Sequence, residues 1–326
     1  MTGSRGMAAI TRTDLENHQV SVYFAAVAAG LLAAAVVPGD AWGAGINPSL
    51  AALTYVTFLQ VPLGDLRRSV TNTRFLSALL LVNFAVVPCI VFGLASILPA
   101  DQSAVRLGVL LVLLAPCIDY VVVFTHLGRG DARLVLAATP VLLLVQMLLL
   151  PIYLGLFAGR DAAALMQPGP FIDAFVWLIA VPLALAGATQ AWAARGGAGQ
   201  AAANAMAWLP VPLMAVVLFL VVAAVAADVA AQARAVALAV PLYIAFAVAM
   251  PYAGRAVARL FRLETGAARA VVFSGGTRNS LVVLPLAFAV PEGGALVPAV
   301  VVTQTLVELV AMLTYVRWVP RLVSAR

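Results

Sequence analysis

Apolar runs of about 20 residues recur along most of the chain, and this length matches the hydrocarbon layer of a membrane. Of the 326 residues, 64% are hydrophobic and only 10% are charged, against about 25% charged residues in an ordinary soluble domain. The sequence therefore predicts an all-α polytopic membrane protein. We expect ten transmembrane helices, at roughly residues 20–38, 46–64, 75–98, 104–126, 133–157, 171–192, 206–227, 235–254, 268–290 and 296–317.

The distribution of arginine predicts how these spans are oriented. Residues 1–19 are polar and contain no apolar segment of the kind that a secretory signal requires, so we expect a short cytoplasmic tail followed by one transmembrane domain over 20–326. If the tail is cytoplasmic, most loop arginines also fall on the cytoplasmic side, and the exceptions are Arg106, Arg160 and Arg234. Positively charged loops face the cytoplasm. The sequence thus predicts a protein of the cell membrane with both termini inside.

Two of the runs are interrupted and carry a charge. Pro116 and Asp119 lie in the fourth run, and Gly275, Gly276 and Arg278 lie in the ninth. Proline and paired glycines weaken a helix, and a broken helix at membrane depth is tolerated only where protein or a polar cavity satisfies its backbone. Breaks near Pro116 and Gly275-Gly276 are therefore expected to mark a binding site.

The two interruptions occupy corresponding places in the two halves of the chain. Each half has five expected spans, so the second half must lie inverted relative to the first. We expect two inverted five-helix repeats at about residues 20–158 and 171–318, with the fourth and ninth helices crossing at their breaks.

One part of the sequence resembles a known family. Residues 114–124, LAPCIDYVVVF, and the following 127–131, LGRGD, resemble the fourth span of the bile acid/sodium symporter superfamily and the turn after it. The closer resemblance is to the arsenical-resistance (arsenite efflux) permease branch, which also has a cysteine in this span, here Cys117, and a tenth-span pattern similar to residues 305–310, TLVELV. The resemblance implies a secondary active transporter that moves a small anion or oxyanion by alternating access.

Departures from the family pattern bear on the coupling ion. Sodium-coupled members carry an acidic residue and a glutamine in the ninth span, where this chain has Ser274 and Arg278, and a polar pair in the fourth, where it has Val121 and Val122. A hard cation needs several oxygen ligands, and a fixed guanidinium would repel it. We therefore expect proton coupling or uniport, with a sodium-coupled symporter of organic anions as the alternative. The glutamate typical of the arsenite branch falls on Leu281, which leaves the substrate open between an arsenite-like oxyanion and an organic anion.

Asp119 and Arg278 are the strongest candidates for the site. A charged side chain at the centre of a bilayer costs about 3 kcal/mol or more, so each should find a partner within the protein. If the two helices cross, the natural partner of each is the other. The pair would then either latch the crossing or act in transport, with Arg278 binding an anion, helped by Asn279 and Ser280, and Asp119 taking up a proton.

Three further residues are candidates with a structural alternative. Asn83 either contacts the substrate or bridges two helices through its amide. Cys117 either offers a soft thiol to arsenite or allows close helix packing. Glu308, with Gln304 one turn away, either couples protons or packs against the fifth span beside Gln146.

Other classes of protein are not supported. The only cysteines, Cys89 and Cys117, are far apart and no histidine cluster accompanies them, so no metal site or cofactor is expected. Catalytic motifs are absent, so we expect no enzyme. The arginines are scattered through loops and do not indicate a nucleic-acid partner. The expected partners are a small anionic molecule, protons and membrane lipid; a channel or a membrane receptor remains the alternative from another class.

Overall fold

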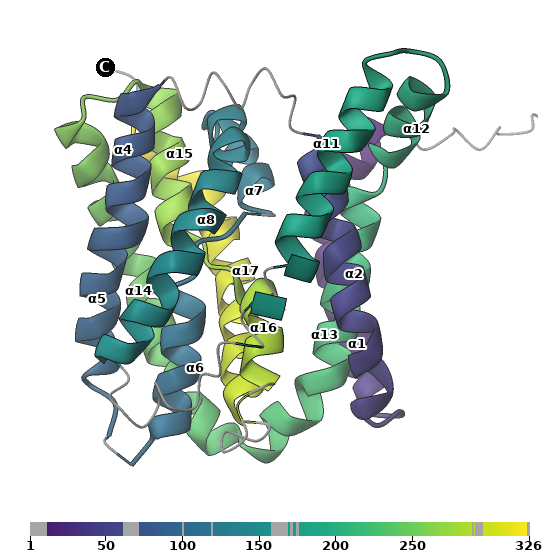
Figure 1. The fold of residues 1–326 in the computed structure, drawn as a ribbon. Coiled ribbons are helices and arrows are strands. Elements are labelled where there is room, and N and C mark those ends of the chain that lie inside the picture. The colour runs from purple at the N-terminus through teal and green to yellow at the C-terminus, as the bar shows by residue number, and fades with distance from the viewer. Residues whose placement is uncertain are drawn as a thin grey trace, which may run out of the picture.

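A computed structural model shows a bundle of helices standing side by side (Figure 1). The structure describes residues 12–60, 72–99, 101–118, 120–157, 169, 172–173, 176–288, 290 and 296–324. Within these residues every regular element is helical. The described part of the chain is thus all-helical. Asp119 and most of residues 158–170, which join the two expected repeats, lie outside the described residues.

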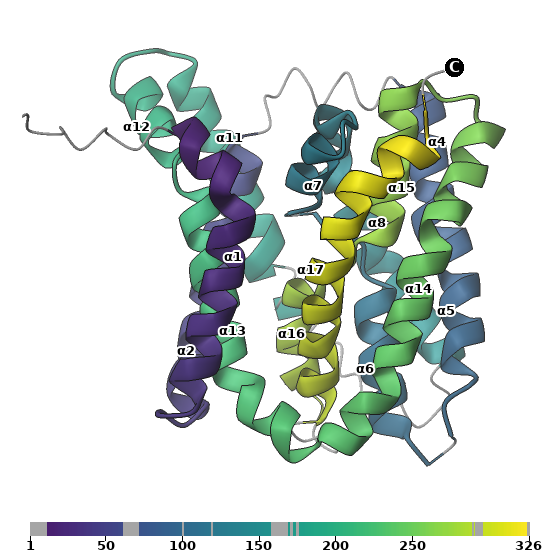
Figure 2. The same ribbon diagram turned by 180° about the vertical axis from the view of Figure 1, so that it is seen from behind.

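The helices form two groups that both views separate (Figures 1 and 2). The first group combines the first two helices with helices from the middle of the chain. It contains α1 (Arg12–Ala34), α2 (Asp40–Leu59), η2 (Val176–Ala180), α11 (Val181–Ala193), α12 (Ala198–Met206) and α13 (Pro210–Ala231). The second group holds α4 (Thr73–Leu81), η1 (Val82–Val86), α5 (Val87–Ala95), α6 (Ser103–Leu113), α7 (Val121–Leu127), α8 (Ala132–Phe157), α14 (Ala233–Leu260), α15 (Thr265–Gly276), α16 (Ser280–Phe288) and α17 (Leu296–Leu322). Helix α1 begins and α17 ends at the same end of the bundle (Figure 2).

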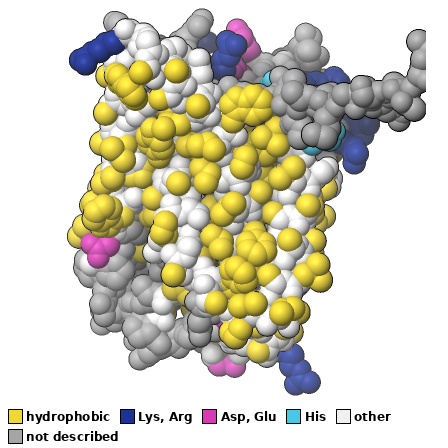
Figure 3. Space-filling view, turned by 90° about the vertical axis from the view of Figure 1, so that its right-hand side faces the viewer, with side chains coloured by type: hydrophobic (Ala, Val, Ile, Leu, Met, Phe, Trp, Pro, Cys, Tyr) yellow, Lys and Arg dark blue, Asp and Glu magenta, His cyan; other side chains and the backbone are white. Residues whose placement is uncertain are grey.

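The outer surface suits a membrane. Six helices of the described chain are long and apolar enough to cross one: Thr73–Ala95, Ala132–Phe157, Val176–Ala193, Pro210–Ala231, Ala233–Leu260 and Leu296–Leu322. Large apolar side chains such as Leu148 and Leu156 are exposed by 72% and 68%. Figure 3 shows such side chains spread over one face, with arginines at its ends. An apolar face of this size belongs in lipid rather than in water.

The two spans with expected interruptions are each divided into two short helices. The first ends at Leu113 in α6 and resumes at Val121 in α7, because Pro116 has no N–H with which to continue the helix. The second ends at Gly276 in α15 and resumes at Ser280 in α16. The break therefore follows the glycine pair instead of lying on it, which corrects the expected position.

The two breaks lie directly against each other. Pro116 and Arg278 form an isolated antiparallel β-bridge. The N–H of Cys117 donates to the carbonyl oxygen of Thr277 at 3.2 Å, and the N–H of Asn279 donates to that of Ala115 at 2.8 Å. Each break thus supplies partners for backbone groups that the other break leaves without a helical partner.

The glycine pair allows close packing. A Cβ on Gly276 would lie 2.5 Å from the Cε2 atom of Tyr315, and one on Gly275 would lie 2.6 Å from Cγ1 of Val82. Both glycines have negative φ, so their role is the close approach of neighbouring helices and not backbone conformation.

Gly276→Ala should therefore destabilise the protein by about 1–3 kcal/mol, the usual cost of overfilling a packed core. Tyr315 cannot easily move, because it is buried and its hydroxyl donates to the carbonyl of Ala247. Gly155→Ala is the matched control, since a Cβ there meets no atom within 4 Å. Thermal unfolding in detergent measures both variants, and equal melting temperatures for the two would contradict the packing role.

Candidate functional site

The guanidinium of Arg278 binds the carbonyl ends of both broken helices. Its Nη2 donates to the carbonyl oxygens of Ser274 at 2.7 Å and Gly275 at 2.6 Å, in the last turn of α15. Its Nη1 lies 3.4 Å from the carbonyl oxygen of Leu113, the last residue of α6. The final carbonyls of a helix have no partner within it and carry partial negative charge. One cation thus caps two half-helices.

The rest of the Arg278 side chain is enclosed by the core. Nη2 also donates to Oδ1 of Asn83 at 2.8 Å, and the guanidinium carbon lies 5.4 Å from the ring centre of Phe246. Asn83 in turn donates to Oγ of Ser274 at 3.1 Å and to the carbonyl of Leu79. Arg278 and Asn83 are both 0% exposed. Asn83 therefore bridges helices in this conformation, as one of the two interpretations of its amide predicts.

The carboxylate of Glu308 lies on the other side of the crossing. Its Oε1 accepts a hydrogen bond from the hydroxyl of Tyr120 at 2.7 Å. Its Oε2 accepts the backbone N–H of Arg278 at 2.8 Å and the side-chain amide of Gln304. Tyr120 directly precedes α7, and Arg278 lies two residues before α16. Glu308 therefore joins α17 to both breaks.

The packing interpretation of Glu308 places it beside Gln146, but its hydrogen bonds go to Tyr120, Arg278 and Gln304. Gln146 of α8 is buried, but its Oε1 has no hydrogen-bond partner among the described residues. Glu308 reaches Tyr120 and Arg278 because α17 passes the crossing, which spacing along the chain does not reveal.

The two charges fit the dipoles of the half-helices. Arg278 binds the C-terminal ends of α6 and α15, where the helix dipole is negative. Glu308 lies beside the starts of α7 and α16, where the dipole is positive and N–H groups lack helical partners. The charges of Arg278 and Glu308 are therefore each opposite in sign to the dipole charges of the helix ends beside them.

The other predicted residues also gather at the crossing. Asn279 accepts the N–H of Val282 on its Oδ1 at 3.0 Å, which caps the first turn of α16. The hydroxyls of Ser280 and Thr305 lie 2.5 Å apart and share a hydrogen bond. Cys117 is 1% exposed and lies within the first break. Whether Asp119 pairs with Arg278 stays a prediction.

Three buried polar atoms around the crossing have no hydrogen-bond partner among the described residues. They are Nε of Arg278, Nδ2 of Asn279 and Oε1 of Gln304. Buried polar atoms are nearly always satisfied, so an unsatisfied one calls for an explanation such as a ligand or water. Two of these atoms are donors, and an anion could accept from both.

A cavity of about 650 Å³ includes Tyr120 in its lining. One wall consists of α1, α2 and α13, including Gln19, Thr57 and Met214, and the other consists of α7 and α8, including His126 and Arg133. Among the described residues that line it, Arg133 is charged and positive, and none is acidic. The wall is otherwise apolar with a few hydroxyl and amide groups, a composition typical of small-molecule sites.

A comparison with family models matches residues 47–234 to the sodium bile acid symporter family. The chain belongs to this family. Its members are membrane transporters, so the cavity and the crossing are parts of a transporter for a small molecule. The match covers Cys117 and Tyr120, whereas Arg278 and Glu308 lie beyond it. No curated protein matches the chain.

Sequence reasoning missed Tyr120 and Phe246. Tyr120 could have been found from its position, since it directly precedes the second half of the broken fourth span and a polar group there can bind at the crossing. Phe246 gives no such signal, because it is one of many aromatic residues in apolar runs and only the packing of α14 brings it to Arg278.

Proposed function

We propose that this family member is a secondary active transporter for an organic anion with an apolar body. The observation that carries the proposal is the position of Tyr120, which lines the cavity and also donates a hydrogen bond to Glu308 at the crossing. A substrate in the cavity therefore lies beside the group that links both broken helices. The ten spans would form two inverted five-helix repeats around this point, in the cell membrane with both termini cytoplasmic.

Charge and volume favour an anion of organic size. Arg133 and the start of α7 make the lining electropositive, and about 650 Å³ exceeds what a small oxyanion needs. Apolar side chains such as Val122, Trp208 and Met214 would contact the body of the anion. Arg278 and Asn279 would bind its charged group through their unpartnered donors when the crossing opens during alternating access.

An arsenite-like substrate is the second candidate, as the resemblance to arsenical-resistance permeases suggests. A soft thiol would have to reach the ligand, yet Cys117 is 1% exposed and is not among the described residues that line the cavity. This burial favours the organic anion.

The capped crossing also favours transport without sodium. The guanidinium of Arg278 already neutralises the carbonyl ends of α6 and α15, where a bound cation would otherwise be stabilised. Proton coupling through Glu308, or through Asp119, or uniport would then replace sodium coupling. Transport, and not catalysis, channel conduction or signal reception, is the activity that we expect.

Counterflow in proteoliposomes tests this function. We expect saturable exchange of a steroidal carboxylate or a long-chain sulfonate, and it should persist when choline replaces sodium. Arg133→Gln should raise the KM by about 10- to 100-fold, because a hydrogen bond to a charged group contributes about 1.5–3 kcal/mol. Arg195→Gln, an exposed arginine outside the cavity, should leave it unchanged. Steep sodium dependence, or exchange of arsenite and no organic anion, would refute the proposal.

A further inference from the structure

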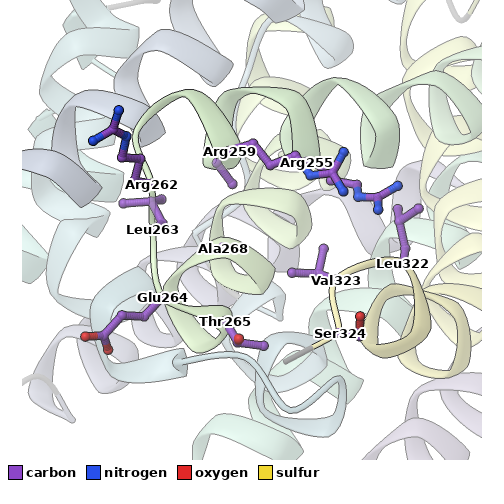
Figure 4. A pocket seen from close by; sticks show the side chains of 11 residues that line it. Arg255, Arg259, Arg262, Leu263, Glu264, Thr265, Ala268, Leu322, Val323 and Ser324 are labelled. Carbon is purple, nitrogen blue, oxygen red and sulfur yellow. The ribbon is translucent and has the colours of Figure 1, made fainter. Parts of the chain in front are cut away.

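A second cavity, of about 700 Å³, lies where α14 turns into α15 beside the end of α17 (Figure 4). Its lining includes Arg255 and Arg259 of α14, Arg262 of the turn, and Leu322 and Val323 at the end of α17. None of these residues takes part in the crossing or in the cavity beside Tyr120. The pocket therefore needs an explanation of its own.

No hydrogen bond or ion pair joins Arg255 or Arg259 to another residue that the structure describes. Arg255 and Arg259 are four residues apart on α14 and thus lie on the same helix face, where like charges repel. Glu264 is the acidic member of the lining, and Figure 4 shows it with Arg262 at the edge opposite to Leu322, Arg255 and Arg259. Among the described residues of the lining, no acidic side chain therefore lies beside Arg255, Arg259 and Leu322.

Arg269 shows what a partnered arginine looks like in the same region. Its guanidinium donates to the carbonyl oxygens of Val323 at 2.9 Å, Arg129 at 3.0 Å and Pro320 at 3.2 Å. These bonds fix the end of α17 against α15. The pocket wall formed by Val323 is thus held in place by the protein itself, whereas the structure gives Arg255 and Arg259 no such bonds to the described residues.

Aromatic residues place the pocket at the membrane surface. Tyr252 of α14 and Trp318 of α17 form an edge-to-face pair with ring centres 5.3 Å apart, and Tyr252 is 52% exposed. Exposed tyrosine and tryptophan are typical of the membrane–water interface. Arg255 and Arg259 follow Tyr252 by about 5 and 10 Å along the helix, given a rise of about 1.5 Å per residue. At this distance beyond the aromatic pair, the two arginines lie at the depth of lipid headgroups. Leu260, which is 71% exposed, lies at the same level as Arg259.

We propose that this pocket binds the phosphate group of an anionic membrane lipid. A guanidinium matches the geometry of phosphate oxygens with paired hydrogen bonds, and basic pockets at this depth attract anionic headgroups. Arg255 and Arg259 bind the phosphate, and Leu322 and Val323 contact the glycerol and the first methylenes. The lipid connects α14 with the end of α17 and so stabilises this corner of the bundle.

Thermal unfolding of the purified full chain in a neutral detergent tests the lipid site. Phosphatidylglycerol should raise the melting temperature by about 5 °C when it is in excess over its dissociation constant, and phosphatidylcholine should not. R255Q/R259Q should lose most of this rise. R74Q/R195Q removes two exposed arginines that do not line the pocket, and it should keep the full rise. R259Q alone, at an exposed position, should lose part of the rise and serves if the double variant does not fold.

Two results would overturn the proposal. One is an equal rise for R255Q/R259Q and R74Q/R195Q, which would mean that phosphatidylglycerol acts through the general charge of the protein. The other is a full rise with inorganic phosphate alone, together with no further effect of phosphatidylglycerol, which would mean that the pocket binds a soluble phosphate. Native mass spectrometry should show one fewer tightly bound phosphatidylglycerol on R255Q/R259Q than on R74Q/R195Q.

Discussion

Replacing Arg278 with methionine should lower the free energy of unfolding by about 3–5 kcal/mol, the usual cost of removing one partner from a buried charged network. The side chain is 0% exposed and binds three carbonyl oxygens and the amide oxygen of Asn83. Methionine fills a similar volume but donates no hydrogen bond, so these acceptors would be buried without partners. Arg278→Lys should cost less, because an ammonium keeps the charge but cannot reproduce the fork of donors.

Urea unfolding or thermal melting in detergent measures this loss. Arg234→Met is the matched control, since Arg234 is exposed and substitutions of that kind usually change stability by less than about 0.5 kcal/mol. Similar stabilities for the two methionine variants would show that the guanidinium does not hold the crossing together. The capping of α6 and α15 would then have to come from other groups.

The interruptions of the two spans could be predicted because their causes are local. Pro116 lacks the N–H that a helix needs, and this holds in any environment. The position of the second break was less accessible: α15 continues through Gly276, because glycine lowers helix stability by only about 1 kcal/mol and tight packing against Val82 and Tyr315 outweighs that cost.

The chemistry of the crossing was only partly accessible from the sequence. Charges inside apolar runs stand out, so Arg278 and Glu308 could be selected as site residues. Their partners depend on how η1, α6 and α17 pack, and nothing along the chain shows that the carboxylate accepts the backbone N–H of Arg278 or that the guanidinium binds carbonyls. The pairing of opposite charges suggested Asp119 as the partner of Arg278. Backbone groups that lose their helical partners at the breaks are equally strong partners for a charged side chain.

Proline also explains contacts elsewhere in the bundle that patterns of hydrophobicity do not reveal. Pro88 cannot donate to the carbonyl of Phe84, four residues earlier, and the hydroxyl of Tyr153 on α8 donates to it instead at 2.5 Å. Pro251 leaves the carbonyl of Ala247 free in the same way, and Tyr315 of α17 donates to it. Tyrosines from other helices thus complete the helices that proline interrupts.

Glu308→Gln should abolish accumulation driven by a proton gradient while leaving the fold and counterflow intact. A glutamine oxygen in place of Oε2 can still accept from Arg278 and Gln304, and its amide can donate to the hydroxyl oxygen of Tyr120, so all three contacts persist with one reversed. Stability should change by only about 1 kcal/mol. What glutamine cannot do is bind and release a proton, so coupling should be lost and exchange retained.

The measurement compares uptake under an imposed pH gradient with counterflow in the same proteoliposomes. Asp101→Asn removes an exposed carboxylate that lines neither cavity, and it should behave as the unmodified protein in both assays. Glu308→Leu, which accepts no hydrogen bond, should lose stability and both activities, because it leaves the donors of Arg278, Tyr120 and Gln304 unpaired. Full accumulation by Glu308→Gln would exclude Glu308 as the proton carrier. Loss of counterflow in a folded Glu308→Gln protein would instead show that the carboxylate serves the substrate path, since exchange requires the helices to move with substrate bound but requires no net movement of protons.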